Sequence, residues 1–123
     1  MLVSGIFFTG VADMKRFLLT ALLLVWASAD NGRDIAWSDA KAYCSHKGTG
    51  WRLPEVTELE SLYGGPMKAH LSGSWLWSAT EVSEQEASDA EDVAWGVQMI
   101  NGARTQNLRP IAFGARALCV KGA

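Results

Sequence analysis

The sequence has few of the residue types from which most catalytic and metal sites are built. Its 123 residues include two cysteines, two histidines and three prolines. Neither His46 nor His70 has a second histidine or a cysteine at a zinc-ligand spacing. No nucleophile stands in a recognisable catalytic motif together with a base and an orienting group. We therefore expect no catalytic residues, no metal site and no cofactor.

The sequence also lacks a basic cluster. It carries 11 Lys and Arg residues against 13 Asp and Glu residues, a net charge of −2. Proteins that bind nucleic acid gather basic side chains on one face to neutralise phosphates. We accordingly expect no nucleic-acid partner and no attraction to anionic membrane surfaces.

The N-terminal segment has the pattern of an export signal. Lys15 and Arg16 precede an apolar run over residues 17–26, which ends in the small-x-small sequence of residues 27–29. This predicts a signal peptide over residues 1–29 that is cleaved after Ala29, in a protein of the periplasm or the extracellular space. Translation from Met14 is an alternative start.

An uncleaved membrane anchor is the weaker interpretation of the same segment. Asp13, Lys15 and Arg16 divide it into two apolar pieces. Each piece is shorter than the roughly 20 apolar residues that cross a bilayer. We expect no membrane insertion after cleavage.

Residues 30–123 then form one small domain. Leaving Asp13, Lys15 and Arg16 out of the totals, this part carries 12 acidic and 9 basic side chains, a net charge of about −3. An oxidising compartment favours a bond between its two cysteines, Cys44 and Cys119. Two buried free thiols are the alternative.

Hydrophobic periodicity predicts an α+β domain with two helices and a small twisted antiparallel sheet. The first helix is capped by Ser38 and stops at Gly48, with Trp37 just outside it. Asn101 and Gly102 predict a two-residue type I′ hairpin turn. The second helix is expected to end at residues 64–65, and strands are expected over residues 74–80, 93–100, from 103 onward and over 116–121.

The segment between residues 81 and 92 is a predicted surface loop with an unusual charge. It contains six carboxylates and no basic residue. Six like charges within twelve residues repel one another unless something neutralises them. The loop is either merely solvated, a docking site for a basic protein, or a weak calcium site, although it lacks the Asp-x-Asp-x-Asp-Gly spacing of calcium loops.

Tryptophan is abundant, and most of the ring systems are expected to fill the core. Trp75 and Trp77 lie on the strand before this loop. If either side chain is exposed beside polar groups, it would contact a ligand. The candidate ligand surface therefore comprises Trp75, Trp77, Glu81, Glu84, Glu86, Asp89, Glu91, Asp92, Arg104, Asn107 and Arg109.

Several sequence blocks share their order and spacing with a known family. They are Trp37-Ser38-Asp39-Ala40-Lys41-Ala42-Tyr43-Cys44, Trp51-Arg52-Leu53-Pro54, Glu58-Leu59, Trp77-Ser78 and Cys119-Val120. Over about residues 34–122 the chain resembles the Lcl C-terminal domain family of exported bacterial modules. It is also similar to the formylglycine-generating sulfatase-modifying domains. The resemblance implies a C-type-lectin-like fold whose first helix is disulfide-bonded to the last strand.

The departures from these patterns bear on function. The Glu-Pro-Asn, Gln-Pro-Asp and Trp-Asn-Asp motifs of calcium-dependent lectins do not occur, and neither does a second cysteine pair like the reactive one of the formylglycine-generating enzymes. We expect an exported, non-enzymatic recognition module that binds a protein or glycan of the cell envelope or extracellular space. The alternative is a small periplasmic enzyme or enzyme inhibitor.

Overall fold

Helices and strands mix along the chain as the α+β prediction requires. The computed structural model describes residues 24–63 and 75–122. Most of the predicted signal peptide, Met14, His70 and the expected helix stop at residues 64–65 lie outside these ranges. The elements are β1 (Leu24–Trp26), α2 (Trp37–Ser45), α3 (Val56–Leu62), β2 (Trp75–Glu81), the 3-10 turn η2 (Ala90–Asp92), β3 (Val93–Gln98), β4 (Arg104–Leu108), β5 (Ala115–Arg116) and β6 (Val120–Gly122).

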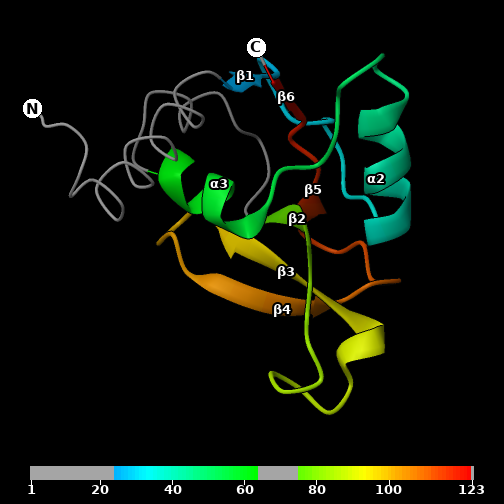
Figure 1. Cartoon of the computed structure of the whole chain (residues 1–123), viewed down its shortest axis with the longest axis vertical. Coiled ribbons are helices and arrows are strands. Elements are labelled where there is room, and N and C mark those ends of the chain that lie inside the picture. Colours follow the sequence, from blue (N-terminus) through cyan, green and yellow to red (C-terminus); the bar gives the residue numbers. More distant parts are fainter. Residues whose placement is uncertain (1–23, 64–74, 123) are drawn as a thin grey trace, which may run out of the picture.

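The strands of residues 24–63 and 75–122 form two sheets (Figure 1). The larger has the order β4-β3-β2-β5, in which β2, β3 and β4 are antiparallel and β5 lies parallel to β2. The smaller is the antiparallel pair β1 and β6. The loop that follows β2 extends at the end of the molecule opposite β1 and β6. The sheet is therefore mixed, whereas the sequence predicted a purely antiparallel one.

The predicted strand over residues 116–121 is wrong in its extent, because the chain changes sheets there. Between β5 and β6 the backbone bonds to the segment that precedes α2. Asn31 N–H donates to Ala117 O over 2.9 Å, and Ala117 N–H donates to Asn31 Oδ1 over 2.8 Å. A partner 86 residues away in the sequence takes the hydrogen bonds that a continuous strand would use.

The β3–β4 hairpin is confirmed, but its turn has four residues, 99–102. Gln98 N–H donates to Ala103 O over 2.9 Å and closes the turn. The strand ends at Gln98, two residues earlier than predicted, and Met99 in the turn is 5% exposed. Gly102 has φ +74°, and a Cβ there would lie 2.7 Å from the ring of Tyr63. Both its conformation and its close contact require glycine.

Helix α2 begins one residue before the predicted cap. Ala36 occupies the N-cap position, and Ser38 makes no capping bond. Trp37 lies inside the first turn, where its Nε1 donates to Ser78 O over 2.8 Å and its side chain is 5% exposed. Anchoring a large buried ring outweighs the gain from a serine cap, which is about 1 kcal/mol.

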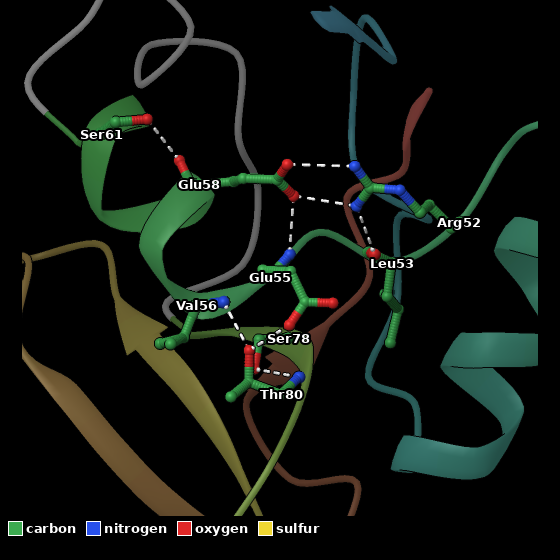
Figure 2. A network of polar contacts seen from close by, with 8 residues as sticks. All are labelled: Arg52, Leu53, Glu55, Val56, Glu58, Ser61, Ser78 and Thr80. Atoms are coloured by element: carbon green, nitrogen blue, oxygen red, sulfur yellow. Dashed lines mark hydrogen bonds and ion pairs between the residues drawn. The ribbon is translucent and has the colours of Figure 1, made fainter. Parts of the chain in front are cut away.

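A polar network fixes the start of α3 against β2 (Figure 2). Glu58 accepts the N–H of Glu55 at 2.8 Å and receives two bonds from the guanidinium of Arg52, at 2.8 and 3.0 Å. Thr80 Oγ1 accepts the N–H of Val56 at 2.8 Å and donates to Glu55 at 2.7 Å. These contacts satisfy backbone N–H groups that a helix terminus leaves free.

The core lies between the helices and the larger sheet and contains the disulfide. Cys44 on α2 and Cys119 are bonded to each other and are no more than 1% exposed. This confirms the predicted pairing. The largest fully buried side chains are Trp77, Leu59, Leu76, Leu118, Val97 and Val120.

Loss of the disulfide should strongly destabilise the domain. The bond closes a loop of 75 residues, which the chain-entropy estimate values at about 4 kcal/mol. We expect Cys44→Ser and added reductant each to lower the melting temperature by well over 10 °C. The control is Ser45→Ala, which changes the exposed neighbouring residue. A melting curve unaffected by reductant would contradict this prediction.

Candidate functional site

The structure places the two candidate tryptophans in the core, so neither contacts a ligand at the surface. Trp75 and Trp77 are 5% and 0% exposed and meet edge to face with ring centroids 4.6 Å apart. Trp77 Nε1 donates to Ile35 O over 2.7 Å, and Trp75 Nε1 donates to Thr105 Oγ1. A Cβ at Gly96 would lie 2.4 Å from the Trp75 ring. The segment before α2 and the neighbouring strands β3 and β4 supply these contacts, so the local sequence of β2 does not reveal the burial.

The acidic loop is exposed, as predicted. It comprises residues 81–92, and all six of its carboxylate side chains are exposed: Glu81, Glu84, Glu86, Asp89, Glu91 and Asp92. The loop is nevertheless folded. Val82, Ala90 and Val93 form a small buried cluster of their own beneath it, against which Trp95 packs. The charges are therefore presented on an ordered support.

One carboxylate of the loop also orders its backbone. Ser83 N–H donates to Glu86 Oε1 over 2.8 Å, and Glu86 N–H donates back to Ser83 O over 2.9 Å. The bond from Ser83, assisted by the Nε1 of Trp95 and the charge of Arg104, lowers the pKa of Glu86. This carboxylate is ionised at neutral pH and contributes to the negative field.

Arg109 fastens the acidic loop to the core. Its Nε donates to Val93 O over 2.8 Å and its Nη2 to Ala90 O over 3.3 Å. The guanidinium carbon lies 4.3 Å from the ring centroid of Trp37, and Nη2 lies 3.7 Å from a carboxylate oxygen of Glu81. Arg109, predicted to offer a polar donor near the loop, therefore has a structural role, because its guanidinium binds two carbonyls and packs on an aromatic face.

Arg104 is likewise held within the protein. Its guanidinium donates to both carboxylate oxygens of Glu60 on α3, over 2.9 and 2.7 Å, and lies 5.7 Å from the ring centroid of Trp95. The hydrogen bond to Arg104 lowers the pKa of Glu60. The pair joins β4 to α3, so Arg104 has a structural role in holding these two elements together.

Two hollows flank the loop on this side of the molecule. One, of about 370 Å³, lies within the loop and is lined by Glu81, Val82, Glu84, Ala90, Glu91 and Arg109. The other, of about 390 Å³, lies where the loop meets β4 and is lined by Asp89, Val93, Gln106, Asn107, Leu108 and Ile111. Of the predicted polar donors, Asn107 lines the second hollow.

Within the described part of the chain, strand β4 is an edge of the larger sheet. The bonds Gln98–Ala103 and Asp92–Arg109 bracket the β3–β4 ladder. By the antiparallel alternation, the backbones of Arg104, Gln106 and Leu108 face away from β3, where no described strand pairs with them. The side chains of Leu108 and Ile111 are each 47% exposed beside this edge. Sequence patterns do not reveal which strand lies at an edge, so this feature was missed.

His46 caps the C-terminal end of α2 and is exposed. It lines a hollow of about 510 Å³ that also contains Asp39 and Tyr43.

Within residues 24–63 and 75–122, no three His, Cys, Asp or Glu side chains are grouped to hold a metal ion. No helix in these ranges is long and apolar enough to cross a membrane.

Acidic loop, hollows and open edge together form what we call the acidic face: residues 81–92, β4 and residues 109–111.

No protein-family model matches the chain, and the comparison with curated proteins finds no match. Among solved structures, a chain in a complex of a mutant von Willebrand factor A1 domain with botrocetin is similar, with a TM-score of 0.51 and 15% identity. The match covers 80% of this chain and 96% of that chain, and it concerns the fold alone.

The Arg109 anchor predicts a specific phenotype. Arg109→Ala should lower the free energy of unfolding by about 2 kcal/mol, because it leaves carbonyls without their charged donor. It should also speed proteolysis and amide exchange within residues 82–92. The control is Arg33→Ala, at an exposed arginine of the segment before α2. Equal exchange rates in the two variants would show that Arg109 does not fasten the loop.

The Arg104–Glu60 pair predicts an acid-sensitive contribution to stability. A carboxylate whose pKa is lowered by folding stabilises above its unfolded pKa of about 4.3, and the contribution is lost as the pH falls through the folded value. Glu60→Gln should therefore flatten the fall in melting temperature between about pH 5 and pH 3. Glu84→Gln, on the exposed loop, is the matched control. Parallel pH profiles for Glu60→Gln and the unmodified protein would refute the assignment.

Proposed function

We propose that the protein is an exported, non-enzymatic recognition module that binds a protein of the cell envelope or extracellular space through the acidic face. The observation that carries the proposal is the juxtaposition of six exposed carboxylates with an open sheet edge and two exposed apolar side chains. A C-type-lectin-like arrangement of the domain is part of the same proposal, and the blocks that resemble the Lcl C-terminal domain family support it.

Export is supported by the disulfide. Bonds of this kind persist in the periplasm and outside the cell, whereas cytosolic reductants keep most thiols reduced. The basic pair before an apolar run, Lys15 and Arg16, supports the same route. A secreted or periplasmic location follows as part of the proposal.

The partner is an extended segment rich in basic residues. The outward N–H and C=O groups of Arg104, Gln106 and Leu108 present the hydrogen-bonding pattern that an added strand requires. Leu108 and Ile111 offer apolar contacts beside that edge, and Asp89 stands at the rim of the adjoining hollow. The carboxylates would pair with alternate basic side chains of such a strand.

Charge governs how this partner arrives. The acidic loop contains no Lys or Arg, and Arg109 and Arg104 are committed to internal contacts. The loop itself therefore carries a net negative charge, which accelerates encounter with a basic partner, and this effect weakens as salt screens it. The similar chain noted above belongs to a complex of two proteins, which is consistent with a binding role for this fold.

Blocking the edge of β4 should abolish partner capture without unfolding the domain. Gln106→Pro removes one outward N–H, a position at which an edge strand tolerates proline. Gln106→Ala keeps that N–H and serves as the control. In quantified pull-downs from cell-envelope extracts, the proline variant should retain less than a tenth of the partner held by the unmodified protein. Equal capture by both variants would remove strand addition from the proposal.

Neutralising the loop tests the charge component separately. The triple change Glu84→Gln, Asp89→Asn and Glu91→Gln should weaken capture at least tenfold at low salt and have less effect at 0.5 M salt, where screening already weakens the contact. Asp39→Asn, an exposed acid on α2, is the control. Capture that is insensitive to these loop changes and to Gln106→Pro would show that the acidic face is not the binding surface. Turnover of any envelope substrate would overturn the non-enzymatic assignment.

A further inference from the structure

The segment that carries the predicted cleavage site is paired within the fold. β1 lies antiparallel to β6, with Leu24 opposite Gly122, Val25 opposite Lys121 and Trp26 opposite Val120. The ladder continues past the strand, because Ala27 N–H donates to Cys119 O over 2.9 Å. The apolar stretch that resembles a signal core therefore ends in a strand.

The same segment contributes side chains to the interior. Ala27 is 8% exposed and belongs to the main core cluster, against which Trp26 packs. Asp30 is also 8% exposed, accepts the N–H of Gly32 at 2.9 Å and lies 3.9 Å from the guanidinium of Arg116. Residues on both sides of the Ala29–Asp30 bond are thus anchored to the C-terminal part of the chain.

β6 depends on this segment for its outer edge. On one side Val120 exchanges two backbone bonds of 2.9 Å with Arg52. On the other side the backbones of Cys119 and Lys121 face Ala27 and Val25. A chain cut after Ala29 would lose β1 and the Trp26 ring, and it would expose an unpaired edge next to the disulfide.

We infer that residues 24–29 are a structural part of the folded domain, and that the protein is not cut between Ala29 and Asp30. Any N-terminal processing lies before Leu24. The small residue at position 27 has another explanation, since Ala27 is buried in the core and the chain bends at residues 28–29 directly afterwards. This inference concerns where the domain begins, and it is independent of what the acidic face binds.

Intact-mass measurement tests the inference directly. The full chain, with its own N-terminal segment, is produced in a bacterial host, and the disulfide-bonded protein is recovered from every compartment that contains it. We expect every folded species to include residues 24–29. A folded, disulfide-bonded product that begins at Asp30 would overturn the inference.

A matched pair of prolines tests the role of β1 in the same full chain. Val25 directs its backbone N–H toward Lys121, whereas Leu24 directs its own away from β6, by the alternation that the Ala27–Cys119 bond fixes. Val25→Pro should lower the melting temperature by several degrees more than Leu24→Pro does. It should also raise amide exchange at Ala27 at least tenfold. Equal melting temperatures and exchange rates for the two variants would show that the strand does not stabilise the fold.

Discussion

The disulfide between Cys44 and Cys119 is the constraint on which the rest of the structure depends. It ties α2 to the short segment between β5 and β6, and this segment is where the two sheets diverge. From the same segment, backbone bonds run outward to Ala27 and Asn31. Without the covalent bond, only the limited hydrophobic core of a domain of this size would hold the chain where it passes from one sheet to the other.

Contacts of an aromatic ring connect this core to the acidic face. Trp37 sits in the first turn of α2, donates to the backbone of β2 and receives the guanidinium of Arg109 on its ring at 4.3 Å. The other bonds of Arg109 end on Ala90 and Val93, which support the acidic loop. The position of the exposed carboxylates therefore depends on a chain of contacts that begins in the interior. Arg109 acts as an anchor of this loop, because a loop with six like charges would otherwise expand.

In the proposed function, charge and edge geometry form a recognition surface only in combination. Acidic side chains alone would be a solvated loop, and a bare edge such as β4 would risk nonspecific pairing. Here the like charge of the loop repels acidic chains, while the exposed Leu108 and Ile111 lie beside outward-facing backbone groups. Under this proposal, the combination would favour one kind of strand, an extended and basic one, and disfavour others.

The sequence by itself determined the α+β class, both helices and the strand of Trp75 and Trp77, because these depend on local periodicity. It also determined the exposure of the acidic loop, which depends on composition, and the pairing of the cysteines, because there are two of them. Only the tertiary structure decided that Trp75 and Trp77 are buried, that Arg109 is an internal anchor and that residues 116–122 divide between two sheets. It also placed Leu24–Trp26, read locally as the end of an apolar signal core, beside β6. Strand partners lie far apart in the sequence, up to nearly 100 residues here, and hydrogen bonding between such distant segments leaves no periodic trace in either one.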